Sequence, residues 1–251
     1  MEDNIIYGTR ALIEAVNEGR ELDRLFIQRG INNPLMNELR ALLKKNEIIY
    51  QLVPVEKLNR ISNRNHQGVI AFVSTVSYYN TEEVLPQIFV SGSAPLFLML
   101  DRITDVRNFG AIARTCECFG VHAVILPSRG GAAINSDAIK TSAGALHKIT
   151  VCRENNLKNT LNYLSESGLQ IVACSEKATK YIDEVDFTIP TVIIMGSEED
   201  GISGEYLRKA NITVKIPMVG SISSLNVSVA AGVILYEVIR QRFDKSYNQN
   251  Q

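Results

Sequence analysis

The segment IPMVGSISSLNVSVAAGVILYEVIRQR, residues 216–242, contains a polar loop followed by a long apolar helix pattern. The β-branched run that leads into it, residues 212–216, predicts a strand, and residues 227–242 predict a helix. Ser224 or Asn226 stands where the N-cap of that helix is expected, because short polar side chains accept hydrogen bonds from the N–H groups of a first turn. A strand, a loop and a helix in this order form one unit of an α/β fold.

The same alternation recurs upstream of this segment. Strands are predicted at residues 96–100, 123–126, 149–152, 170–174 and 191–195, with helices at 112–119 and 157–167. Strands that alternate with helices favour a parallel sheet that is covered on both faces. We therefore expect one α/β domain over residues 95–251.

The first 76 residues form a separate pattern. Helices are predicted at residues 9–17 and 34–45, and strands at 22–27, 48–53 and 68–76. Residues 77–94 contain Pro86, Gly92 and several serines, a composition that is typical of a linker. The sequence thus predicts a small α/β domain at 1–76, a linker at 77–94 and the larger domain beyond it.

The composition is that of a globular protein. Of 251 residues, 45% are apolar and 21% are charged, which argues against disorder and against a fibre. No apolar run approaches the roughly 18 to 20 residues of a membrane helix, and the start MEDNIIYGTR lacks the apolar core of a signal peptide. The four cysteines fit neither a disulfide framework nor a zinc spacing, so we expect reduced thiols in the cytoplasm, no membrane partner and no metal.

The net charge of -1 conceals two locally basic stretches. Lys57, Arg60 and Arg64 lie in a stretch without acids, and residues 118–153 carry four Lys or Arg against Asp137 alone. Such stretches either contact phosphates or form solvated faces that distant acids balance, and charge alone does not decide between these.

In an open parallel sheet, ligands bind beyond the carboxyl ends of the strands. Three loops hold that position, DRITDVRNFGAIARTCECFG at 101–120, GSEEDGIS at 196–203 and PMVGSISSLN at 217–226. None is a phosphate-binding loop or a G-x-G-x-x-G fingerprint, which weakens an ATPase or an NAD enzyme. Asn108 stands where a helix N-cap is expected, and Gly196 would let a ligand approach the backbone. Each loop taken alone is equally compatible with a cap or a tight turn.

Together the three loops resemble the motifs of the SpoU/TrmH ribose methyltransferases. The matching stretches are LDRITDVRNFGAIARTCECFGVHAVILP, IIMGSEEDGIS and the segment 216–242. In addition, YGTRALIEAV and NHQGVIAFV resemble the ribosomal-protein-L30-like extension of the large-subunit rRNA guanosine methyltransferases of this family. The resemblance therefore spans nearly the whole chain.

The resemblance implies an α/β domain with a trefoil knot, preceded by an L30e-like domain, in a homodimer that uses S-adenosylmethionine. It implies cofactor contacts at Gly196, Ile216 and Leu225. It implies catalytic or orienting roles for Asn108, Arg114, Glu198, Ser224 and Asn226. The expected reaction is 2′-O-methylation of a guanosine in 23S rRNA.

Methyl transfer to a ribose hydroxyl is an in-line displacement, so positioning supplies much of the rate. A guanidinium almost never gives up its proton. We therefore expect Arg114 to stabilise the developing alkoxide or to anchor the phosphate, while a role as base stays open. In the N-terminal domain, Asn65 and Gln67 are candidates to read base edges, and His66 either stacks on a base or is a packed, hydrogen-bonded residue.

Three other functions remain open at this point. The chain could be an inactive RNA-binding adaptor, although replacement of Arg114, Asn226 or the Gly196 loop would then be expected. It could act on tRNA, although the family members that do so typically have shorter, basic terminal extensions. It could also be an antibiotic-resistance methyltransferase that acts on an rRNA adenosine.

Overall fold

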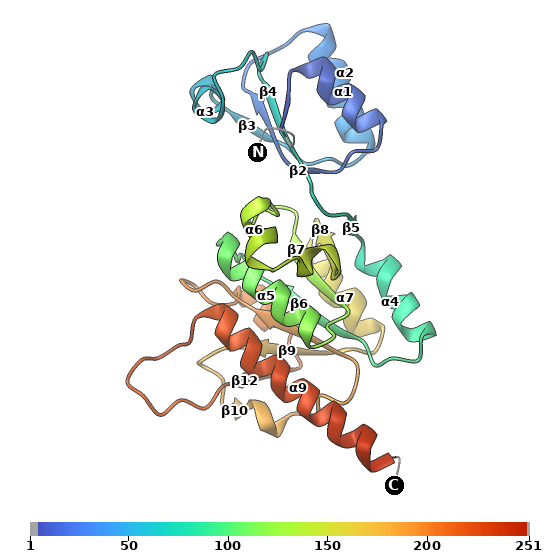
Figure 1. Cartoon of the computed structure of the whole chain (residues 1–251), viewed down its shortest axis with the longest axis vertical. Coiled ribbons are helices and arrows are strands. Elements are labelled where there is room, and N and C mark those ends of the chain that lie inside the picture. Colours follow the sequence, from blue (N-terminus) through green and yellow to red (C-terminus); the bar gives the residue numbers. More distant parts are fainter. Residues whose placement is uncertain (1–4, 250–251) are drawn as a thin grey trace. The chain divides into compact units, whose positions relative to one another are not determined.

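The structure is a computed structural model that describes the backbone of residues 5–249 and the side chains of residues 5–243. The chain divides into two compact units (Figure 1). Unit 1 extends to Ser77 and includes Ala133–Asn135, and unit 2 contains the remaining residues.

Unit 1 contains a mixed four-stranded sheet in the order β1-β4-β2-β3. Its strands are β1 (Ile5–Tyr7), β2 (Leu22–Gln28), β3 (Gln51–Val53) and β4 (Val69–Val73). Strand β4 runs antiparallel to β1 and β2, whereas β3 runs parallel to β2. The sequence predicted an α/β unit here but did not predict β1.

Helices cover both faces of this sheet because successive side chains along its strands point to opposite faces, and both faces carry apolar residues. Leu25 and Ile27 of β2 pack with α1 (Thr9–Asn17) and α2 (Pro34–Lys45), whereas Phe26 packs with Leu58 of α3 (Val55–Ile61) on the other face. Helix α2 begins where predicted, since the side chain of Asn33 accepts a 2.8 Å hydrogen bond from Met36 N and Pro34 occupies the first helical position.

The predicted linker, residues 77–94, contains regular structure. Strand β5 (Tyr78–Tyr79) pairs with β8 (Thr150–Glu154), and helix α4 (Thr81–Val90) follows it. The Oε1 atom of Glu154 accepts hydrogen bonds from the backbone N (2.7 Å) and hydroxyl (2.6 Å) of Thr81. Leu85 and Ile88 of α4 are buried in the core of unit 2. This segment is therefore an integral part of unit 2.

Unit 2 is built on an eight-stranded sheet in the order β10-β12-β9-β11-β6-β7-β8-β5. Every neighbouring pair is parallel, which confirms the predicted parallel sheet. The central strands β6 (Leu96–Leu100) and β11 (Thr191–Met195) are buried at every position. The other strands are β7 (Ala123–Pro127), β9 (Gln170–Cys174), β10 (Lys180–Tyr181) and β12 (Ile212–Lys215).

Helices pack on both faces of this sheet. On one face, α4, α7 (Leu157–Glu166) and α8 (Gly204–Leu207) join a core with the side chains of Phe97 and Met99. Figure 1 shows α5 (Val106–Cys118) and α9 (Val227–Gln249) side by side in front of the sheet. Three short helices complete the unit, α6 (Ser136–Thr141), η1 (Ala145–His147) and η2 (Ile182–Glu184). The trefoil knot stays a prediction.

Helix α6 was not predicted, and Gly110 explains how it packs on α5. A Cβ atom on Gly110 would lie 2.8 Å from the carbonyl oxygen of Ala138 and 2.8 Å from Cβ of Thr141. Only glycine allows this approach of the two helices. No helix among the described residues is long and apolar enough to cross a membrane.

Candidate active site

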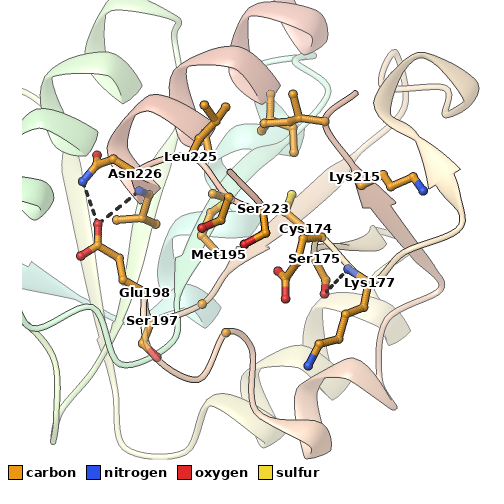
Figure 2. A pocket seen from close by; sticks show the side chains of 18 of the residues that line it. Cys174, Ser175, Lys177, Met195, Ser197, Glu198, Lys215, Ser223, Leu225 and Asn226 are labelled. Carbon is orange, nitrogen blue, oxygen red and sulfur yellow. Dashed lines mark hydrogen bonds between the residues drawn. The ribbon is translucent and has the colours of Figure 1, made fainter. Parts of the chain in front are cut away.

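A pocket of about 460 Å³ lies at the carboxyl ends of strands β9, β11 and β12, where the parallel sheet predicts a ligand (Figure 2). It is lined by the loops that follow these strands and by the start of α9, residues 174–177, 195–201, 214–216 and 223–227 among them. Of the three loops selected from the sequence, 196–203 and 217–226 therefore line one pocket. The third, 101–120, reaches the rim of this pocket.

The loop after β9 was not selected from the sequence, yet Ser175, Glu176 and Lys177 line the pocket. Strand β9 lies between β12 and β11 in the sheet, so its loop must open at the same edge. The rule that places ligands beyond strand ends would have found this loop if it had been applied to every predicted strand.

The carboxylate of Glu198 is the point where the three motif loops meet. Its Oε1 atom accepts hydrogen bonds from the side-chain amides of Asn226 (2.7 Å) and Asn108 (3.1 Å). The Asn226 amide also donates to Oδ1 of Asn108 at 3.0 Å. Figure 2 shows Glu198 and Asn226 pointing toward one another at one end of the pocket. Three of the predicted polar residues are thus brought into direct contact.

Asn226 has two roles that the sequence left as alternatives. Its Oδ1 accepts a 2.9 Å hydrogen bond from Ser228 N, which makes Asn226 the N-cap of α9. Its amide nitrogen is the donor to Glu198. One side chain therefore caps the helix and joins it to the loop after β11.

Asn108 is not the N-cap of α5, contrary to its predicted place. The cap is Asp105, whose Oδ1 accepts a 2.7 Å hydrogen bond from Asn108 N. The helix consequently begins at Val106, six residues before the predicted start at 112. Asn108 lies in its first turn, where the side chain is available to Glu198.

Gly196 lines the pocket, but its lack of a side chain is required by the chain itself. A Cβ atom at this position would lie 2.1 Å from the carbonyl carbon of Gly201 and 2.3 Å from Ile202 N. The loop closes on itself there, since Ser197 and Gly201 exchange two backbone hydrogen bonds of 3.2 and 3.0 Å. The side-chain position of Gly196 is thus filled by backbone, whereas its own backbone lines the pocket, and the cofactor contact there stays a prediction.

The remaining predicted residues divide into two groups. Ile216, Ser224 and Leu225 line the pocket. Arg114 lies outside the set of described residues that line it and is exposed on α5. Asn108 and Arg114 are six positions apart, which turns their side chains about 120° from one another around the helix. The structure therefore does not bring Arg114 to the pocket of its own chain.

Charged groups of both signs line the pocket. Glu176, Glu198, Glu199 and Asp200 provide carboxylates, whereas Lys177 and Lys215 provide ammonium groups. Burial raises the pKa of the Cys174 thiol, so this pocket residue is protonated at neutral pH and is no thiolate nucleophile. The lining suits a ligand that carries positive charge together with a carboxylate.

His66 in unit 1 is a packed, hydrogen-bonded residue. Its Nδ1 accepts a 3.0 Å hydrogen bond from Gly68 N, and its Nε2 lies 2.9 Å from Oδ1 of Asn59. The ring is buried, whereas the neighbouring Asn65 and Gln67 are exposed. Of the two roles left open for His66, the structure favours the internal one.

Two family models match the chain. One, described as the SpoU rRNA Methylase family, matches residues 95–236. The other, described as RNA 2'-O ribose methyltransferase substrate binding, matches residues 5–79. A TrmH family tRNA/rRNA methyltransferase of Staphylococcus saprophyticus is 37% identical over 243 residues, which cover 96% of this chain and 97% of that protein.

Solved structures share the fold. The SpoU methyltransferase AviRb from Streptomyces viridochromogenes, in complex with AdoMet, is 25% identical with a TM-score of 0.61 and covers 96% of this chain and 90% of its own. The TrmH/SpoU tRNA modifying enzyme of A. aeolicus is 34% identical with a TM-score of 0.57, over 66% of this chain and 85% of its own.

Proposed function

The chain belongs to the SpoU rRNA Methylase family of RNA methyltransferases, and from this premise we propose that it transfers a methyl group from S-adenosylmethionine to a ribose 2′-hydroxyl. The proposed substrate is a guanosine of 23S rRNA. The observation that carries the proposal is the junction at Glu198, which joins the three motif loops at one end of the pocket.

The pocket fits S-adenosylmethionine by its chemistry. When bound, this cofactor supplies an activated methyl group on a sulfonium centre, together with an amino-acid group of both charges. The carboxylates of the lining complement the positive centres, and Lys177 or Lys215 complements the carboxylate. We assign cofactor contacts to Gly196, Ile216 and Leu225, which belong to three of the segments that line the pocket.

Glu198, Asn108 and Asn226 orient the reacting groups in this proposal. Their mutual hydrogen bonds hold the loop after β11 against the first turns of α5 and α9. The second carboxylate oxygen of Glu198 and the hydroxyl of Ser224 are the groups we assign to the ribose. Such fixed donors and acceptors contribute by positioning rather than by forming covalent bonds.

We assign Arg114 to the pocket of a partner subunit. The next residue, Thr115, lies beside Gly232 of α9, so Arg114 is next to the line where α5 and α9 meet. Val229, Val233 and Tyr236 lie on one face of α9 and are 52%, 36% and 60% exposed. Apolar side chains in such a row favour contact with a second protein surface. A homodimer through this face would cover them and bring Arg114 to the other chain.

In such a dimer the guanidinium of Arg114 would meet the hydroxyl that attacks or its neighbouring phosphate. It keeps its own proton and stabilises the negative charge that develops on the ribose oxygen as this oxygen bonds to the methyl carbon and its proton passes to water. Its planar fork donates two parallel hydrogen bonds to a phosphate, which a lysine does not reproduce.

We propose that unit 1 selects the RNA. Lys57, Arg60 and Arg64 are exposed on α3 and on the loop that follows it, and Asn65 and Gln67 are exposed on the same loop. The hydrogen bond between His66 and Asn59 ties this loop to α3, so the groups form one surface. Cations that bind phosphates beside amides that read bases suit a structured or single-stranded RNA.

A tRNA substrate is the second candidate. The Staphylococcus relative is named for both tRNA and rRNA, and the A. aeolicus enzyme is named as tRNA modifying. The similarity to the A. aeolicus enzyme covers 66% of this chain, whereas the substrate-binding model occupies residues 5–79. This separate N-terminal unit supports the rRNA proposal.

Mapping of 2′-O-methyl groups in cells tests the proposal. Total rRNA and tRNA from cells that lack the protein are compared with RNA from cells that carry it or its Arg114→Ala variant. We expect the loss of one ribose methyl group in 23S rRNA, restored by the wild-type gene and not by the variant. Loss of a tRNA methyl group would establish the second candidate, and no loss in either RNA would overturn both.

A further inference from the structure

Asp101, the first residue after β6, is a buried carboxylate that belongs to none of the roles assigned above. Its side chain is only 3% exposed. Its Oδ2 accepts hydrogen bonds from the backbone N (2.6 Å) and the hydroxyl (2.7 Å) of Ser203. Ser203 is the last residue of loop 196–203, so Asp101 fixes the far end of that loop to the end of β6.

Arg102 fixes the middle of the same loop. Its Nε donates to Oδ1 of Asp101 at 3.0 Å, its Nη2 donates to the carbonyl oxygen of Gly201 at 3.1 Å, and its Nη1 donates to Oδ2 of Asp200 at 3.0 Å. The hydrogen bond to Asp101 raises the pKa of this guanidinium, which stays charged. One planar group therefore joins the buried carboxylate to two successive residues of the loop.

The backbone of Arg102 is adapted to this contact. Its φ of +56° is left-handed, a conformation that non-glycine residues rarely adopt unless their surroundings enforce it. Strained residues of this kind cluster at functional sites. The turn directs the guanidinium back toward the loop after β11 instead of along the course of the chain into α5.

The contacts of Arg102 lie directly behind the pocket wall. Gly201 and Ile202 are the residues whose backbone packs against Gly196, and Gly196 to Gly201 line the pocket. The same loop carries Glu198, whose position sets the junction with Asn108 and Asn226. Movement of Gly201 would therefore displace both the cofactor wall and the junction.

We propose that Asp101 and Arg102 are positioning residues, which hold loop 196–203 in the conformation that binds S-adenosylmethionine. Neither residue lines the pocket, so both act through the loop. This inference rests on the proposed function, since it concerns the affinity of the same pocket for its cofactor.

The Arg102→Lys variant is the first test, because it keeps a cation beside buried Asp101 and keeps the side chain long. A single ammonium group cannot reach Asp101, Gly201 and Asp200 together. We expect the dissociation constant for S-adenosylhomocysteine, measured by calorimetry, to rise about tenfold, with the thermal midpoint of the ligand-free protein nearly unchanged. Arg102→Gly should raise it further, and glycine adopts the left-handed backbone without strain.

Two controls separate positioning from general stability. Arg20→Ala removes an exposed pair in unit 1 and should leave cofactor affinity unchanged. Leu164→Ala opens a cavity under α7, so it lowers the thermal midpoint without touching the loop.

The outcomes are distinct. If the wild-type protein does not bind S-adenosylhomocysteine, the proposed function is wrong. If the wild type binds and both Arg102 variants bind equally well, the inference is wrong. It is also wrong if Leu164→Ala weakens binding as much as the Arg102 variants do. Weaker binding confined to the Arg102 variants supports it.

Discussion

The side-chain amide of Asn226 donates a 2.7 Å hydrogen bond to Oε1 of Glu198, across 28 positions of the sequence. The same Glu198 oxygen accepts from Asn108, which lies 90 positions before it. This junction connects the starts of helices α5 and α9 to loop 196–203, which lines the pocket. The proposed methyl transfer depends on the amides of Asn108 and Asn226 continuing to donate their hydrogen bonds to Glu198.

Asn226→Asp should disrupt the junction while preserving the helix cap. Aspartate still caps α9, but two carboxylates would face each other, which repels them and raises the pKa of one. Below that raised pKa a shared proton restores a hydrogen bond, and above it both groups are charged. We expect single-turnover methylation to fall about 10²-fold at pH 8 relative to the wild type, with partial recovery of this ratio near pH 6.

The matched control is Asn156→Asp at the N-cap of α7, away from the pocket. It should leave the rate unchanged at both pH values. A wild-type rate for Asn226→Asp at pH 8 would remove the junction from the mechanism.

Gly196→Ala should abolish cofactor binding because its Cβ would overlap the backbone at Gly201 and Ile202. Gly220→Ala, in the loop before α9, meets no atom within 4 Å and provides the control. Calorimetry with S-adenosylhomocysteine compares the two, and equal affinities would show that the 196–203 loop does not contact the cofactor.

Arg114→Ala should reduce single-turnover methylation about 10²- to 10³-fold at saturating cofactor, with the cofactor affinity nearly unchanged. Arg114→Lys should recover little of the rate. In mixtures with Gly196→Ala, hybrid dimers contain one pocket with an intact loop that faces an intact Arg114, so part of the activity should return. If Arg114→Ala alone methylates at the wild-type rate, and mixing it with Gly196→Ala raises that rate no further, the arginine has no part in methyl transfer.

The exposed face of α9 should mediate self-association. Tyr236→Glu places a charge among Val229 and Val233, where a partner would have to desolvate it. We expect a dimer in analytical ultracentrifugation for the wild type and a monomer for this variant. Val90→Glu, at an 89% exposed position of α4, is the control and should remain dimeric.

A chain that starts at Tyr78 should bind S-adenosylhomocysteine but fail to methylate rRNA, because it lacks residues 1–77 of unit 1. A chain that starts at Ser93 also loses α4, whose Leu85 and Ile88 are buried in the core. Loss of these two side chains should lower the thermal midpoint by roughly 10 °C or more. Thermal melting compares the two truncations, and methylation at the full rate by the longer one would refute RNA selection by unit 1.

The parallel sheet of unit 2 could be predicted because its central strands are almost entirely apolar, as LFLML at 96–100 illustrates. Helix α4 could not, since Pro86, Gly92 and the nearby serines are typical of a linker, and only the structure shows that Leu85 and Ile88 are buried in the core. Local propensity is a weak prior that tertiary packing overrides.

Some of the site residues could likewise be predicted from the sequence, whereas others depend on tertiary structure. The motif loops predicted Glu198 and Asn226, but TDVRN at 104–108 offers three capping residues, and residue type alone does not show that Asp105 is the cap. The contact of Arg102 with Gly201 depends on a left-handed turn that no local pattern encodes. The β9 loop, in contrast, follows a strand that the sequence did predict at 170–174.

The hydrogen bonds of Arg242 give α9 a second attachment. Arg242 donates to the carbonyl oxygens of Phe187, Ala94 and Ile189 at the edge of the sheet opposite the pocket. Helix α9 is thus fastened by Asn226 beside the pocket and by Arg242 at the opposite edge of the sheet. Because a helix is a rigid element, a shift of the backbone around Ala94 would be transmitted along α9 to Asn226, so the pocket is mechanically coupled to the far edge of its own sheet.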